Sequence, residues 1–119
     1  MIIGIGTDIV RASRIKPEDE AFLRKAFTPD EIIYIKSKGR YAAAGIFAAK
    51  EAIAKALGTG FRGFGPADVE ITYDERGRPV VQLYNNAEAL AKEKKARDTH
   101  VSIAHDGEYA TAFAVIEGG

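Results

Sequence analysis

The stretch Phe47-Ala48-Ala49-Lys50-Glu51-Ala52-Ile53-Ala54-Lys55 decides the fold, because it predicts a long helix that other elements cover. Alanines dominate it, and they favour both helix formation and close packing. Phe47, Glu51 and Lys55 recur at four-residue spacing and therefore share one face. A carboxylate beside ammonium groups on a covered helix indicates a place for a hard cation and a phosphate. The alternative is an ordinary salt bridge on an amphipathic helix.

Strands and shorter helices are expected before and after this helix in the sequence. Thr28, Pro29 and Glu31 carry the signature of a capped helix start, and Gly58 is placed to end the long helix. The sequence predicts helices over 16–26, 28–38, 40–57 and 85–95, and strands over 2–10, 67–73, 80–84, 99–104 and 109–116, the first of them buried. This order predicts one α+β domain over residues 1–119, with a mostly antiparallel sheet packed against one long helix and shorter helices.

Composition restricts the classes of function. Of the 119 residues, 46% are apolar and the formal net charge is zero, so the chain can bury a core. Charge balance argues against a general nucleic-acid binder or an anionic-membrane binder. The absence of cysteine excludes disulfides and thiolate chemistry. No segment has the length of a membrane span or the pattern of a signal peptide, so we expect a cytoplasmic protein.

Two acidic residues far apart in the sequence are candidate metal ligands. Asp8 ends the first predicted strand, after Gly4-Ile5-Gly6-Thr7, and Glu51 lies on the long helix. Together they offer two oxygen donors, which suits Mg²⁺. Taken alone, Asp8 is better explained as a turn or capping carboxylate. The Gly-x-Gly pattern before it is a weak dinucleotide-binding signal, because the third glycine is absent.

The two histidines do not form a zinc site, since their spacing is not helical and thiols are absent. His105 is suited to contacting a phosphate or a base, or to a structural role. A hydrolase using Ser102 and His105 is a further hypothesis, although the glycines of a nucleophile elbow are missing. Arg14 and Arg24 belong to a basic segment that suits an acidic partner, or that is simply solvated.

Three separated motifs resemble one family, the holo-acyl carrier protein synthases, which are 4′-phosphopantetheinyl transferases. The motifs are Gly4-Ile5-Gly6-Thr7-Asp8-Ile9, Phe47-Ala48-Ala49-Lys50-Glu51-Ala52 with Lys55, and Val101-Ser102-Ile103-Ala104-His105-Asp106. The resemblance covers essentially the whole chain. It implies transfer of the phosphopantetheine arm of coenzyme A to a serine of apo-acyl carrier protein, in fatty acid biosynthesis. It also implies a homotrimer with sites between neighbouring subunits.

The resemblance also implies roles for individual residues. Asp8 and Glu51 match the ligands of Mg²⁺, and Lys55 matches a lysine near the pyrophosphate. The remaining matches are Lys50 as a basic residue beside the metal-binding glutamate, His105 at the nucleotide end of coenzyme A, and Arg14 at the carrier-protein contact. We therefore expect Lys50, Lys55, Gly58 and His105 to bind coenzyme A, and Arg24, from the same basic segment as Arg14, to help dock the carrier protein. The general base is left open among metal-bound water, Glu51 and Asp8.

One position departs from the family pattern. Relatives commonly carry an arginine directly before the aromatic residue of the second motif, and this chain has Ile46 there. Arg40, Arg62 or a neighbouring subunit could replace that phosphate anchor. A non-catalytic module that binds a nucleotide or a carrier protein is the second hypothesis. Paired carboxylates argue against it, because without a metal they repel phosphates.

Overall fold

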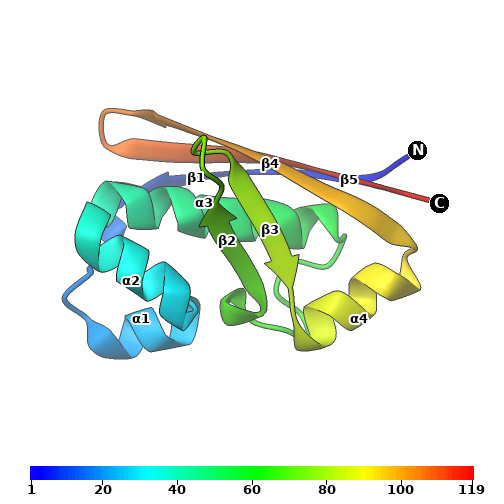
Figure 1. Ribbon diagram of the computed structural model, residues 1–119, viewed down its shortest axis with the longest axis horizontal. Helices are drawn as coiled ribbons and strands as arrows, with labels where there is room; N and C mark the ends of the chain where they lie inside the picture. The colour runs from blue at the N-terminus through cyan, green and yellow to red at the C-terminus, as the bar shows by residue number, and fades with distance from the viewer.

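Helix α3 (Arg40–Ala56) is the central layer of the molecule (Figure 1). A three-stranded sheet covers one side of it, and the shorter helices and a β-hairpin lie on the other side. The computed structural model describes all residues 1–119. In chain order the remaining elements are β1 (Ile2–Arg11), the 3₁₀ turn η1 (Ala12–Arg14), α1 (Glu20–Ala26), α2 (Pro29–Lys38), the 3₁₀ turn η2 (Pro66–Asp68), β2 (Val69–Tyr73), β3 (Pro79–Leu83), α4 (Asn85–Glu93), β4 (Ala96–Asp106) and β5 (Tyr109–Gly118).

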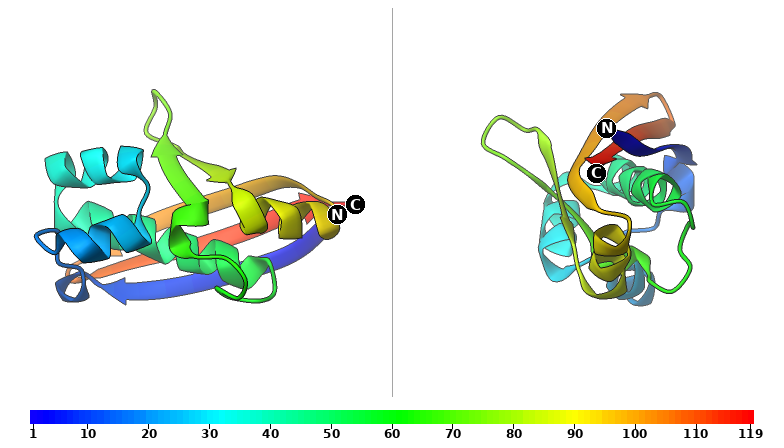
Figure 2. Two further views of the ribbon diagram at one scale, coloured as in Figure 1. Left: turned by 90° about the horizontal axis from the view of Figure 1, so that it is seen from below. Right: turned by 90° about the vertical axis from the view of Figure 1, so that its right-hand side faces the viewer.

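The strands form two antiparallel sheets, which confirms the predicted α+β class. The larger sheet has the order β1-β5-β4, and β2 pairs only with β3. Asp8 lies opposite Ala112 of β5, which in turn lies opposite Ile103 of β4. The hairpin of β2 and β3 projects from the body of the molecule (Figure 2). The first and last strands run side by side, and the two termini lie together.

Small residues allow α3 to lie very close to the larger sheet. A Cβ atom added to Gly4 would be 1.9 Å from the carbonyl oxygen of Ala56, and one added to Gly6 would be 2.0 Å from that of Ala52. The inward-facing residues of β5 include Ala110, Ala112 and Ala114, all buried. The two glycines of β1 therefore serve helix–strand packing.

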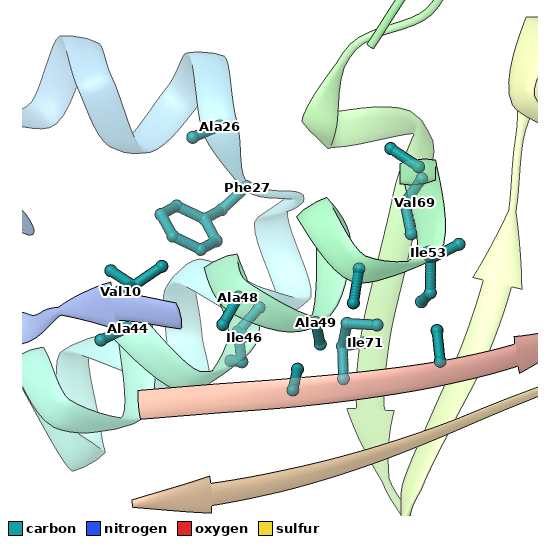
Figure 3. Close-up of a cluster of buried hydrophobic side chains, with 14 of the residues drawn as sticks. Val10, Ala26, Phe27, Ala44, Ile46, Ala48, Ala49, Ile53, Val69 and Ile71 are labelled. Carbon is teal, nitrogen blue, oxygen red and sulfur yellow. The ribbon is translucent and has the colours of Figure 1, made fainter. Parts of the chain in front are cut away.

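One hydrophobic cluster joins the layers (Figure 3). It contains residues of both sheets and of all four helices, and on α3 it includes Ile46 and Ile53, which are fully buried. Phe27 packs in the same region, where its ring contacts those of Phe22 and Phe47 at centroid distances of 6.0 and 6.2 Å. Helix α3 is thus covered on most of its surface, as its alanine-rich sequence predicts, and the stripe of Phe47, Glu51 and Lys55 is left partly open.

The predicted capping box of α2 is present and does more than cap the start of the helix. Thr28 Oγ1 accepts from the backbone N–H of Glu31, and Glu31 Oε1 accepts from that of Thr28. Glu31 Oε2 also accepts from the backbone N–H of Ile71, and Glu31 Oε1 lies 2.6 Å from Lys50 Nζ. Burial raises the pKa of Glu31 and lowers the pKa of Lys50, while the surrounding hydrogen bonds favour their charged forms.

The structure corrects three predictions of detail. Helix α1 begins at Glu20 and not at residue 16, because Asp19 caps it and Pro17 disfavours helix at the residue before it. Strand β4 starts at Ala96 and extends to Asp106. Strand β1 is buried on one face only: Ile5 and Ile9 are 61% and 63% exposed, since their side chains point away from α3.

No helix combines the length and the apolar character that crossing a membrane requires.

Gly6→Ala should lower the free energy of unfolding by about 2–4 kcal/mol, because its new methyl group would meet helix backbone that cannot move aside. Urea unfolding followed by circular dichroism measures the change. Gly65→Ala is the matched control, since its φ is −115° and its Cβ would contact no atom within 4 Å. A similar loss in both variants would contradict the close-approach explanation.

Candidate active site

Asp8 and Lys55 meet where β1 passes α3. Lys55 Nζ lies 3.1 Å from Asp8 Oδ1 and donates a hydrogen bond to the carbonyl oxygen of Thr7 at 2.9 Å. The side chain of Asp8 is 18% exposed and that of Lys55 is 51% exposed. An ammonium group has three donors, so one N–H of Lys55 is left for another acceptor.

Glu51 completes this group, which we call the carboxylate cluster (Asp8, Glu51 and Lys55). Glu51 is half-buried one helical turn before Lys55. Burial raises the pKa of Glu51, and the nearby charge of Asp8 raises it further, while Lys55 and Arg14 act in the opposite direction. Two carboxylates are therefore held close enough to repel one another. Such a pair favours binding of a proton or a cation.

The carboxylate cluster fits a hard divalent cation. Two carboxylates from separate elements supply oxygen donors, and the exposed side of the cluster leaves room for water and phosphate oxygens. Mg²⁺ is typically held in this way, by one or two carboxylates together with water and substrate phosphate. Burial and the neighbouring Asp8 raise the pKa of Glu51, and a bound cation would offset both effects. Asp8 and Glu51 are the residues that would hold it.

Lys50 does not join the carboxylate cluster, although the resemblance implies a place for it beside the metal. Its side chain is fully buried, and Nζ contacts Glu31 Oε1 at 2.6 Å and the carbonyl oxygens of Pro66 and Val69 at 2.8 and 2.5 Å. All three donors of the ammonium are thus used inside the protein. A contact between Lys50 and coenzyme A is therefore not part of our proposal.

His105 lies at the end of β4, on the edge of the sheet opposite to β1. Its Nε2 is 2.9 Å from the carbonyl oxygen of Tyr41, and because a carbonyl only accepts, Nε2 carries the hydrogen. His105 also covers Gly45, whose added Cβ would lie 2.9 Å from Nε2. The other ring nitrogen, Nδ1, is left to accept a hydrogen bond.

An open cavity of about 480 Å³ adjoins His105, and we call it the histidine pocket. Burial, together with the nearby Tyr34 and Glu31, raises the pKa of Tyr73 to about 12, so this phenol stays neutral. The rings of Tyr34 and Tyr73 stack at a centroid distance of 4.9 Å. The residues that line the histidine pocket include Tyr34, Tyr73, Arg78, Pro79, Ser102, Ile103 and His105.

Sequence reasoning singled out His105 but gave no binding role to Arg78, Tyr34 or Tyr73. The only signal for Arg78 was its position in the hairpin turn Gly77-Arg78-Pro79. Tyr34 and Tyr73 carried no signal, because they belong to α2 and β2 and meet only through the tertiary fold.

The remaining predicted site residues lie around these two regions. Gly58 follows the end of α3 with φ +93° and begins the glycine-rich loop. Arg14 is exposed in η1, near enough to Glu51 to lower its pKa. Arg24 is exposed in the last turn of α1.

A Ser102–His105 hydrolase receives no support from the geometry. These residues are three apart on β4, and their side chains point to opposite faces. His105 Nε2 is bonded to Tyr41 and not to Ser102. His100 pairs with Glu117, with 2.7 Å between Nε2 and Oε1.

Comparison with known proteins places the whole fold in one family. The model of the 4′-phosphopantetheinyl transferase superfamily matches residues 4–114. Holo-[acyl-carrier-protein] synthase of Clostridium beijerinckii is 51% identical, over 98% of each chain. The crystal structure of the Neisseria meningitidis holo-[acyl-carrier-protein] synthase aligns with a TM-score of 0.89 and 35% identity, over 98% of this chain and 99% of that one.

A relative solved with a ligand is also similar. The Helicobacter pylori holo-[acyl-carrier-protein] synthase, in complex with coenzyme A, aligns with a TM-score of 0.84 and 31% identity, over 95% of this chain and 99% of that one. The resemblance noted in the sequence is thereby confirmed. The chain belongs to the 4′-phosphopantetheinyl transferase superfamily.

Proposed function

We propose that this protein transfers the 4′-phosphopantetheine group of coenzyme A to a serine hydroxyl of apo-acyl carrier protein. The serine oxygen forms a bond to the β-phosphorus, the pyrophosphate bond breaks, and adenosine 3′,5′-bisphosphate leaves. The carboxylate cluster carries the proposal, because it unites two acidic side chains and a lysine at one exposed position. The family and the names of the relatives support the same reaction.

Each member of the carboxylate cluster has a task in this reaction. Asp8 and Glu51 would hold Mg²⁺, which when bound offsets charge on the pyrophosphate and orients it. Lys55 has one free N–H and would donate it to a phosphate oxygen of the departing group. Glu51 and Asp8 would also be candidate acceptors for the serine proton.

The histidine pocket would hold the nucleotide end of coenzyme A. Arg78 offers a guanidinium to a phosphate, and Nδ1 of His105 accepts a hydrogen bond. Gly58 and the loop after it adjoin the end of α3, near Lys55, and would contact the phosphopantetheine side. Relatives commonly have an arginine at the position of Ile46, which is fully buried here and cannot contact a phosphate. Arg78 lines the histidine pocket and is therefore our candidate for that phosphate anchor.

The two regions lie apart within one chain. Asp8 is on one edge strand and His105 on the other, with β5 between them and α3 packed over β5. One coenzyme A therefore reaches both regions more readily if one subunit supplies the carboxylate cluster and its neighbour the histidine pocket. This separation supports the homotrimer with sites between subunits.

The outer face of the larger sheet supports assembly as well. Ile5, Ile9 and Phe113 are 61%, 63% and 49% exposed. No helix or hairpin lies over the face of the larger sheet that points away from α3 (Figure 1). Exposed apolar patches of this kind mark interaction surfaces. A second copy of the chain is the occupant that the separated regions of the site require.

Arg14 and Arg24 would dock the carrier protein. Both are exposed, and Arg14 lies beside the carboxylate cluster, where the acceptor serine must arrive. An acidic carrier protein would be attracted to this basic side. The cytoplasmic location and the role in fatty acid biosynthesis belong to the same proposal and rest on the resemblance.

The second hypothesis, a non-catalytic binding module, gives no role to the two carboxylates of Asp8 and Glu51. A pure binder of coenzyme A or carrier protein gains nothing from Asp8 and Glu51 beside phosphates. A transfer assay separates the two hypotheses.

Glu51→Ala should lower the transfer rate on the order of a hundredfold or more, because it removes one of two cation ligands. Mass spectrometry of apo-acyl carrier protein incubated with coenzyme A and Mg²⁺ measures the added phosphopantetheine. A chelator should abolish transfer by the wild type, and Glu93→Ala, an exposed acidic control on α4, should leave it unchanged. Absence of transfer by the wild type would favour the binding module.

Mg²⁺ binding should weaken as the pH falls, since protons compete for Glu51. The pKa of Glu51 is raised from 4.5, so this loss begins at a higher pH than for an ordinary glutamate. The pKa of Glu51 is higher in the folded than in the unfolded protein, so the folded state binds the proton more tightly. The stability of the metal-free protein therefore falls as the pH rises through the pKa of Glu51 and its carboxylate becomes charged.

Glu51→Gln should therefore melt a few degrees higher than the wild type at neutral pH in chelator, and the gap should close in acid. Added Mg²⁺ should stabilise the wild type and not the variant. Thermal melts from about pH 4 to about pH 8 measure both effects. An equal rise for the control Glu93→Gln would refute the assignment to the acidic pair.

Mixed trimers test whether two subunits share a site. Glu51→Ala and the double variant Arg78→Ala/His105→Ala should each be nearly inactive alone. Refolded together, they should regain about a quarter of the wild-type rate, because each region is intact in half of the subunits. A rate equal to the sum of the two residual activities, in trimers shown by differential tags to be mixed, would place the whole site in one chain.

A further inference from the structure

Lys50 is a fully buried cation next to Glu51 in the sequence. Its ammonium contacts Glu31 Oε1 and the carbonyl oxygens of Pro66 and Val69, at 2.6, 2.8 and 2.5 Å. The ring of Phe27 lies 5.5 Å from Nζ. Every donor of the ammonium has an acceptor, and the buried charge has an opposite charge beside it, which is the condition under which such a group is tolerated.

The three acceptors belong to three different parts of the chain. Glu31 caps α2 and also receives the backbone N–H of Ile71 on β2. Pro66 begins η2, directly after the glycine-rich loop, and Val69 begins β2. Lys50 therefore fastens α3 to α2, to the end of the loop and to β2 at one point.

The opposite surface of α3 packs on β1 through small residues, and the exposed side chain of Lys55 adds the only described hydrogen bonds there, to Asp8 and to the carbonyl oxygen of Thr7. Against β1 the helix meets Gly4 and Gly6, and its own contacting residues include Ala52 and Ala56. A surface of alanines against glycines allows close approach but little interdigitation. Hydrogen bonds to Lys50 are directional, and they fix both the rotation and the axial position of the helix.

Glu51 depends on that rotation. Adjacent residues of a helix are turned about 100° from each other, so burying Lys50 against α2 and β2 directs the face of Glu51 and Lys55 toward β1. We infer that Lys50 is a positioning residue, which holds α3 so that Glu51 faces Asp8 at the spacing a divalent cation needs. The inference rests on the proposed function, because it assumes that Asp8 and Glu51 bind the cation.

Two Lys50 variants separate positioning from stability. Lys50→Met leaves the buried Glu31 without its cation and will be strongly destabilised. The double variant Glu31→Gln/Lys50→Met removes both charges and keeps one amide oxygen that can complete the capping box, so it should recover part of the lost stability, although that oxygen cannot accept from both Thr28 and Ile71. It still lacks the donors to Pro66 and Val69.

Isothermal titration of each metal-free protein with MgCl₂, and the Mg²⁺ dependence of the transfer rate, are the measurements. Both variants should bind Mg²⁺ about 10-fold to 100-fold more weakly than the wild type, as expected when groups that orient a ligand are removed. Leu23→Ala is the control, because it destabilises the core from α1 and removes no hydrogen bond or ion pair of Lys50 or of the carboxylate cluster. Its Mg²⁺ affinity should match that of the wild type.

The outcomes distinguish the inference from the proposed function. Wild-type Mg²⁺ affinity in a folded double variant would overturn the positioning role alone. Equal weakening in Leu23→Ala would also overturn it, since loss of stability would then explain the effect. A wild type that binds no Mg²⁺ would instead overturn the proposed cation site on which the inference rests.

Discussion

The close approach of α3 to β1 is the constraint on which the rest of the structure depends. Gly4 and Gly6 bring the backbone of the strand against the carbonyls of Ala56 and Ala52, where a Cβ atom would not fit. Only at this separation does Lys55 reach both Asp8 and the carbonyl oxygen of Thr7. The glycines that resemble part of a nucleotide-binding loop thus act on the active site through packing.

Helix α3 carries a buried charge that is fully paired, on Lys50, and partly exposed charges that are not, on Glu51 and Lys55. Lys50 is fully buried and its three donors are all used, so its charge fixes structure. Glu51 and Lys55 lie on the open stripe, where the acidic pair is incompletely balanced and a donor is free. Helical geometry produces this division, because neighbouring residues face different surroundings.

The two parts of the proposed active site lie at opposite edges of the larger sheet, so the proposed reaction depends on assembly of more than one chain. The carboxylate cluster belongs to β1 and α3, while His105 belongs to β4 at the other edge. The sheet also exposes an apolar outer face with Ile5, Ile9 and Phe113. A chain of 119 residues has little concave surface of its own, so the proposed site between copies would supply the enclosure that a nucleotide needs.

Local sequence determined the helix caps, the alternating strands and the members of the carboxylate cluster, because periodicity and capping act over a few residues. The motifs also identified the family. Only the tertiary structure decided that Lys50 is buried, that Ile5 and Ile9 are exposed, and that Arg78 shares a pocket with His105. These outcomes depend on which distant elements pack together. The residues next to a side chain in the sequence do not determine which residues of other elements surround it in the fold.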